Sequence, residues 1–169
     1  MVQYTNVDGL DAIDYAILEQ LQREGRISNA DLARRINLSQ PATYARVKRL
    51  EQDGYIAGYS ARLNREKLGY GMLCYIHLSG QMHQRSQLEE LRQALVDMPE
   101  VLECAFVTGE FDFLIKVVLR NQLDLERFIL HKLTPLPGVG RVNTSLVVAE
   151  IKSTTALPIP SAAATDAGP

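Results

Sequence analysis

The chain has 169 residues, of which 46% are hydrophobic, so it can form one ordinary domain or two small ones. A formal net charge of −2 argues against a protein that binds polyanions over its whole surface. Two cysteines, Cys74 and Cys104, are too few for a disulfide framework, and their apolar surroundings predict buried thiols. The three histidines show no metal-ligand spacing, and no run reaches the roughly 20 apolar residues that span a bilayer.

The first third of the chain predicts three short helices. Asp11 can cap the first helix and Gly25 ends it, with Ile13, Ile17, Leu18 and Leu21 at helical spacing between them. Ser28 begins the capping sequence "SNAD" of the second helix. Asn37 tolerates a left-handed turn, and Ser39 then caps a third helix that extends to about residue 53. Two short helices joined by a tight turn form the unit that enters a DNA major groove.

The basic residues of this region are concentrated in one window. Residues 32–50 carry five positive charges and no acid, which favours a local nucleic-acid surface, although a solvated helix face or a structural bundle is the alternative. Helical spacing leaves Gln40, Tyr44 and Lys48 facing outward to read bases, while the arginines contact phosphates. The predicted DNA-binding residues are Arg34, Arg35, Ser39, Gln40, Pro41, Tyr44, Ala45, Arg46, Lys48 and Arg49.

The remainder of the chain predicts a second domain. The segment "YIAGYSARLN" alternates like a short strand or hairpin arm, and "NREKLGYG" is typical of a linker. After it, apolar periodicities predict strand, helix, strand, strand, helix and strand, which is the order of a ferredoxin-like βαββαβ domain. We therefore expect an α+β protein: a winged helix-turn-helix domain over 1–63, a linker over 64–70, the ferredoxin-like domain over 71–152 and a flexible tail over 153–169.

The segment "VTGEFDFLIKV" joins two of the predicted strands and carries two carboxylates, Glu110 and Asp112. Such a pair can serve as a general acid and base, as half of a metal site, or as a recognition site for a charged small molecule. The sequence offers no phosphate loop, metal cluster or nucleophile with a base to complete an active site. Backbone N–H groups near Gly109 can hold a carboxylate while a side-chain carboxylate binds an ammonium, and an amino acid presents both groups. The alternative is that these acids only cap a turn.

The stretch "GRISNADLARRINLSQPATYARVKRLEQDGYIAGY", followed by "VTGEFDFLIKV" and "TSLVVAEIK", resembles the Lrp/AsnC or feast/famine transcription factors over about residues 10–152. The resemblance implies dimers formed through the ferredoxin-like domain, often assembled into octamers, and an amino-acid effector bound near the loop. Glu110 stands where aspartate is more usual, and Asn37 replaces the usual turn glycine. The effector-binding residues expected on this basis are Thr108, Gly109, Glu110, Phe111, Asp112, Gln122, Thr144, Ser145 and Leu146.

These observations predict a cytoplasmic, nucleoid-associated regulator that binds specific double-stranded DNA and responds to an amino acid or related metabolite. No catalytic residue, cofactor or membrane segment is expected. An architectural protein of the same fold that needs no effector is the main alternative, and an enzyme of ferredoxin-like fold is a third. Because two helices cover one face of such a sheet, the other face should be buried against a symmetric partner. The residues expected on that face are Leu73, Tyr75, Val118, Val147 and Ala149.

Overall fold

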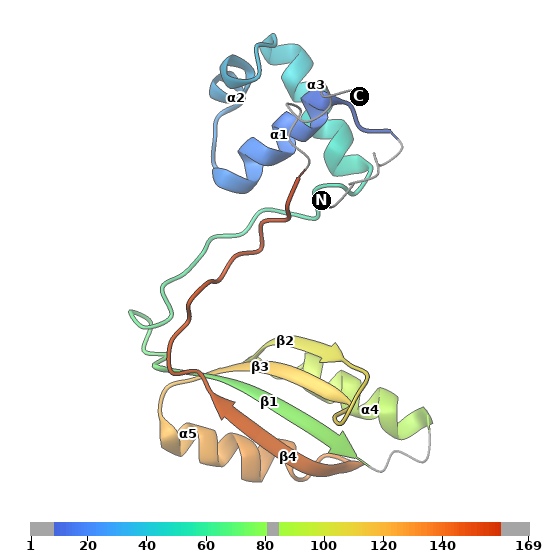
Figure 1. Cartoon of the computed structure of the whole chain (residues 1–169), viewed down its shortest axis with the longest axis vertical. Helices are drawn as coiled ribbons and strands as arrows, with labels where there is room; N and C mark the ends of the chain where they lie inside the picture. The colour runs from blue at the N-terminus through green and yellow to red at the C-terminus, as the bar shows by residue number, and fades with distance from the viewer. Residues whose placement is uncertain (1–8, 81–84, 160–169) are drawn as a thin grey trace, which may run out of the picture. The chain divides into compact units, whose positions relative to one another are not determined.

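The computed structural model describes residues 9–80 and 85–159, so His83 lies outside the described residues (Figure 1). The chain divides into two compact units. The first comprises residues 1–62 together with 153–169, and the second comprises residues 63–152. Among the described residues, no helix is both long and apolar enough to cross a membrane.

Three helices build the first unit: α1 (Ala12–Arg23), α2 (Asn29–Arg35) and α3 (Gln40–Gln52). Each begins where a capping side chain was predicted, at Asp11, Ser28 and Ser39 respectively. Asn37 adopts a positive φ of 55° in the turn between α2 and α3, as its short polar side chain permits. The helix-turn-helix predicted from the sequence is therefore confirmed.

The core of this unit consists of Ile17, Leu32 and Leu50, which are buried where the three helices meet. Residues 55–64 contain no strand, contrary to the alternation of "YIAGYSARLN". Strand structure needs a neighbouring strand to complete its hydrogen bonds, and no described segment pairs with this one. Instead, the backbone N–H of Ile56 donates to the carbonyl of Leu50 at 3.1 Å, and the Ile56 side chain packs against the core.

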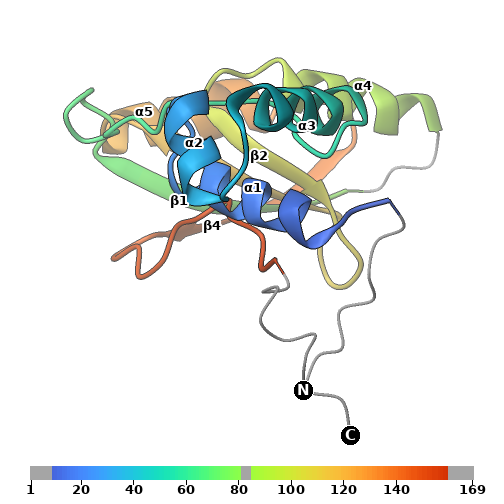
Figure 2. The ribbon, with the colours of Figure 1, turned by 90° about the horizontal axis from the view of Figure 1, so that it is seen from above.

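The second unit contains β1 (Met72–Gly80), α4 (Arg85–Val96), β2 (Val101–Phe106), β3 (Phe113–Leu119), α5 (Gln122–Arg127), η1 (Phe128–Leu133) and β4 (Val139–Leu146). The four strands form one sheet in the order β2-β3-β1-β4, and all neighbouring strands are antiparallel (Figure 1). This is the predicted ferredoxin-like topology. It places β2 and β4 at the two edges of the sheet. Figure 2 shows the same ribbon from above, with β1, β2 and β4 labelled.

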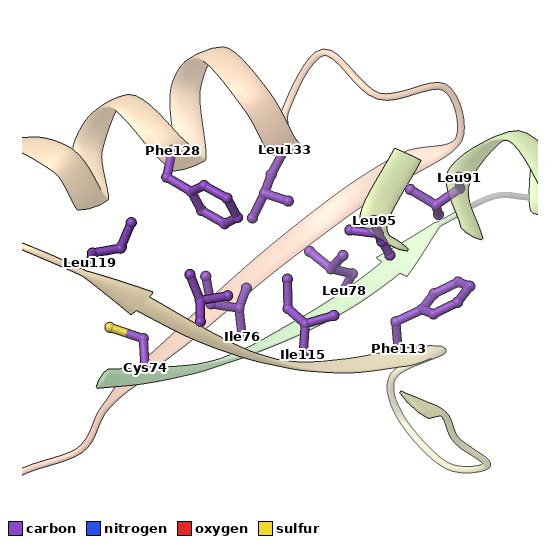
Figure 3. Close-up of a cluster of buried hydrophobic side chains, with 11 residues drawn as sticks. Cys74, Ile76, Leu78, Leu91, Leu95, Phe113, Ile115, Leu119, Phe128 and Leu133 are labelled. Carbon is purple, nitrogen blue, oxygen red and sulfur yellow. The ribbon is translucent and has the colours of Figure 1, made fainter. Parts of the chain in front are cut away.

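The helices pack on one face of the sheet and bury an apolar core there (Figure 3). Alternate residues of β1 and β3 point toward the helices, since successive side chains of a strand face opposite sides. The fully buried members are Cys74, Ile76, Leu78, Leu91, Leu95, Phe113, Ile115, Val117, Leu119, Phe128 and Leu133. The predicted burial of Cys74 is correct, whereas the prediction for Cys104 is wrong: Cys104 is exposed because it lies on the edge strand β2.

The second predicted helix of this unit is observed as two parts. After α5, the chain widens into the π-helical segment η1, where the N–H of Thr134 donates to the carbonyl of Ile129 at 2.9 Å. The bond spans five residues instead of four, so the turn holds one extra residue. The apolar positions predict a helix here in either case, and spacing alone does not distinguish the two forms.

The end of the described chain differs from the expected flexible tail. The backbone N–H of Leu157 donates to Oε1 of Gln22 at 2.6 Å, and Nε2 of Gln22 donates to the carbonyl of Leu157 at 3.1 Å. Leu157 thus joins residues 153–159 to helix α1 within the first unit. Residues 160–169 lie outside the described part of the chain.

Candidate DNA interface and effector loop

The exposed side of α3 carries the residues that were predicted to read DNA bases. Its inner side is set by Thr43 and Leu50, which are fully buried. Tyr44 is 57% exposed, and Nζ of Lys48 lies 5.9 Å from the centre of its ring. The exposed residues of this helix include Gln40, Pro41, Tyr44, Ala45 and Lys48. The hydroxyl of Ser39 accepts a bond from the N–H of Ala42 at 3.4 Å, so this predicted contact residue also caps the helix.

The basic side chains around this helix all have acidic partners within the chain. Arg34 pairs with Asp31, and Arg35 pairs with Glu24 at 2.7 Å. Lys48 pairs with Glu51 at 3.0 Å; this contact raises the pKa of the lysine and lowers that of Glu51. These ion pairs are largely exposed, and such pairs contribute about 0–1 kcal/mol each, so a phosphate group can compete for the cations.

Two other arginines of α3 have a different environment. Nη1 of Arg46 contacts the Asp11 carboxylate at 2.7 Å and the Asp14 carboxylate at 2.9 Å, and Arg49 also bonds to Asp14. Hydrogen bonds to Asp11 and then Asp14 raise the pKa of Arg46. Asp14 is only 1% exposed, so these contacts fasten α3 to α1. The sequence analysis did not single out Asp14.

The loop between β2 and β3, where an effector was expected to bind, is attached to the end of β1 by Asp112. Its N–H donates to the carbonyl of Leu78 at 2.9 Å, and its Oδ2 accepts from the N–H of Gly80 at 3.0 Å. Its carbonyl accepts from Val107 at 2.8 Å, which closes the loop. The Asp112 carboxylate is therefore already used in holding the loop in place. Gly109 has a φ of 133°, which favours glycine, and open space lies around its Cα.

Glu110 extends from the same loop to Arg141 of β4, with 3.2 Å between the carboxylate and guanidinium. The Phe111 ring lies beside this pair, 5.7 Å from the Arg141 guanidinium and 4.7 Å from the His77 ring. Nδ1 of His77 is buried and has no hydrogen-bond partner among the described residues. The loop and β4 thus bring together the Glu110 carboxylate, the Arg141 guanidinium and the aromatic ring of Phe111. Thr108 is exposed in the same loop.

His77 and Arg141 were missed by the sequence analysis. Both positions follow from the ferredoxin-like topology, because β1 lies between β3 and β4 and the pairing of Leu78 with Val142 brings the start of β4 to the loop. Alternation along β1 then places His77 on the face opposite the core. The predicted strand order and the direction of β4 could therefore have identified both residues from the sequence.

Four other predicted effector residues lie away from the loop within one chain. Gln122 follows the far end of β3. Six steps of about 3.3 Å from Phe113 to Leu119 place that end about 20 Å from the loop. Along β4, Thr144, Ser145 and Leu146 pair with Ile76, Tyr75 and Cys74, toward the far end of β1. The expectation that they adjoin the loop is wrong for a single chain, because β4 runs antiparallel to β1 and brings its first residues, not its last, to the loop.

Residues 10–57 match a family of winged helix-turn-helix DNA-binding domains, and residues 73–157 match the Lrp/AsnC ligand binding domain. The leucine-responsive regulatory protein of Haemophilus influenzae is 39% identical over 86% of this chain and 87% of its own length. The Bkd operon transcriptional regulator of Pseudomonas aeruginosa is 34% identical, covering 89% of this chain and 98% of its own.

A transcriptional regulator of Neisseria meningitidis, solved as a complex with L-methionine, has a similar structure. It superposes with a TM-score of 0.85 at 34% identity, covering 88% of this chain and 96% of the other. These relatives are regulators and not enzymes. The reading of the two loop acids as a catalytic pair is thereby set aside.

Proposed function

Because the chain belongs to the Lrp/AsnC family of transcriptional regulators, we propose that α3 binds specific double-stranded DNA and that an amino acid at the loop 107–112 changes that binding. The observation that carries the proposal is the Glu110–Arg141 pair, which lies next to the Phe111 ring and the open backbone at Gly109.

The geometry suits the zwitterion of an amino acid. Its carboxylate can bind the Arg141 guanidinium in a bidentate manner, and its ammonium can bind the Glu110 carboxylate. The two protein groups are 63% and 69% exposed, and an exposed ion pair contributes only about 0–1 kcal/mol, so a ligand can take over both partners at small cost. The Phe111 and His77 rings, tilted by 38° to each other, then offer an aromatic surface to the ligand's side chain.

On the DNA side, the exposed positions of α3 have the chemistry of base recognition. Gln40 can bond to adenine, Tyr44 can contact a thymine methyl group or a phosphate, and Lys48 can bond to guanine. Arg34 and Arg35 lie in α2, where exchange of their carboxylate partners for phosphate would fix the position of the helix on the duplex.

We also infer a homodimer, assembled further into an octamer. Exposed apolar side chains of the second unit support association: Leu102 and Phe106 on the edge strand β2 are 54% and 53% exposed, and Val148 is 96% exposed. Leu73 and Val118 were expected to become buried only against a partner, but they are already buried within one chain. A cytoplasmic location on the nucleoid would follow from DNA binding.

The test combines calorimetry and gel-shift assays with each of the twenty common amino acids. We expect at least one to bind and to alter the DNA shift, and both Arg141→Gln and Glu110→Gln to remove these effects while the free protein still binds DNA. Arg92→Gln is the matched control, because Arg92 forms another exposed pair, with Glu89 on α4. The proposal fails if no amino acid binds, or if Arg141→Gln responds like the native chain.

A further inference from the structure

A cleft of about 560 Å³ opens at the end of the sheet opposite the loop 107–112. It lies where β3 ends and α5 and η1 pass over the sheet. Its volume is within the range of 300–1,000 Å³ that is typical of small-molecule sites. Pro99, Leu119 and Phe128 supply an apolar lining, and Arg120, Arg127 and His131 supply a basic one.

The basic lining is not neutralised by neighbouring side chains in the described part of the chain. The side chains of Arg127 and His131 form no ion pair or hydrogen bond there, and the Arg120 guanidinium lies 5.9 Å from the ring of Tyr70. In contrast, the nearby Lys132 is held by Glu100 at 2.5 Å. Two guanidinium groups and an imidazole are thus available, and the acids of the lining are Asp124 and Glu100, of which Glu100 pairs with Lys132.

The helix beside the cleft has an unusual local form. The π-helical segment η1 begins at Phe128, whose ring points toward the sheet (Figure 3), and it also carries His131. Such wide turns are rare in proteins, and those that are found lie frequently at functional sites. Here the π-helical turn contributes both an apolar and a basic group to the same cleft.

We propose that this cleft binds a small organic anion, with a carboxylate or phosphate held by Arg120, Arg127 and His131 and an apolar body lying on Pro99, Leu119 and Phe128. Guanidinium groups hold either oxyanion through paired hydrogen bonds. The site is separate from the effector loop and does not depend on the proposed function, because its ligand needs an anionic group and no ammonium.

Calorimetry with three probes of similar size tests the proposal on the full chain. 3-Phenylpropionate carries a carboxylate, phenyl phosphate carries a phosphate, and 3-phenylpropanamide is neutral. We expect at least one anion to bind saturably and the amide to bind about tenfold more weakly or not at all, as the loss of one charge-assisted hydrogen bond predicts. The relative affinity of the two anions then identifies the preferred oxyanion.

Two exposed arginines distinguish this cleft from the loop. Arg127→Gln should weaken binding of the preferred anion about tenfold, whereas Arg141→Gln should leave it unchanged. Both residues are exposed, so circular dichroism should show native folding in each variant. Equal affinity for the amide, absence of binding by both anions, or undiminished binding by Arg127→Gln would each overturn the proposal. Failure of amino acids to bind at the loop would leave this result unaffected.

Discussion

Replacement of Asp14 by alanine tests how the recognition helix is held. Asp14 is 1% exposed and accepts the N–H of Asp11 at 3.1 Å, which completes the capping box of α1. It also accepts bonds from Arg46 at 2.9 Å and from Arg49. The substitution therefore removes one helix-capping contact and both side-chain ion pairs that Asp14 makes with α3.

The expected loss of stability follows from these contacts. A helix-capping contact contributes about 1 kcal/mol, and hydrogen bonds to charged groups contribute about 1.5–3 kcal/mol each when buried. The Arg46 and Arg49 side chains are 28% and 45% exposed and can return to water, so roughly 1 kcal/mol for each is appropriate. The total is about 3 kcal/mol, at the lower end of the range of about 3–5 kcal/mol for breaking a fully buried pair.

Thermal unfolding followed by circular dichroism measures this effect. For a unit of this size, about 3 kcal/mol corresponds to a fall in the midpoint on the order of 10–20 °C. Asp53→Ala is the control, because Asp53 is an exposed aspartate of the same unit, and its midpoint should change by no more than a few degrees. A shift for Asp14→Ala as small as that of the control would refute the fastening role.

Three further predictions concern DNA recognition, pH and assembly. Tyr44→Ala should reduce discrimination at one base step by about 1–3 kcal/mol, and unchanged binding to single-base variants of the operator would exclude Tyr44 as a reader. The first unit should lose stability as the pH falls below about 4. Burial raises the pKa of Asp11, but hydrogen bonds from the Asp14 backbone and from Arg46 outweigh this effect and hold the pKa below the ordinary value of 3.8. The stabilising effect of the Asp11 carboxylate is therefore present above pH 3.8 and is lost when the group is protonated. Thermal midpoints that stay constant from pH 6 to pH 3 would contradict this. Light scattering at micromolar concentration should show at least a dimer, and a stable monomer would rule out the inferred assembly.

Much of the fold could be predicted because its signals are local. Each of the first three helices has a capping side chain one residue before it, and side chains alternate along β1 and β3 between a buried and a more open face. The features that were missed depend on distant contacts. The bond of Gln22 to Leu157 joins residues 135 positions apart, and the π-helical turn differs from an α-helix by a single residue.

The candidate site was predicted in part for the same reason. The loop residues from Thr108 to Asp112 are contiguous, so a short motif was enough to find them. Arg141 joins them only through the pairing of β4 with β1, and a motif search along the chain cannot detect that contact. The role of Asp112 was also hidden, because its partner, the N–H of Gly80, is a backbone group without a sequence signature.

The basic window shows how a linear pattern can overstate a surface charge. Residues 32–50 carry five cations and no acid, yet in the folded unit all five are paired with acids outside that window. Those acids are Asp11, Asp14, Glu24, Asp31 and Glu51. DNA must therefore compete with carboxylates for every one of these cations.

The salt dependence of DNA binding should reflect this competition. Five free cations per helix-turn-helix would give a slope of log K against log salt of about −4.5, since each phosphate contact contributes about −0.9. Arg46 and Arg49 are held by the buried Asp14, which leaves three exchangeable cations and a slope of about −2.7. Arg35→Gln should reduce its magnitude by about 0.9, whereas Arg46→Gln should leave it nearly unchanged at a temperature where the variant is folded. A native slope near −4.5 per helix-turn-helix, or a slope lowered equally by both substitutions, would show that phosphates displace Asp14 from the arginines of α3.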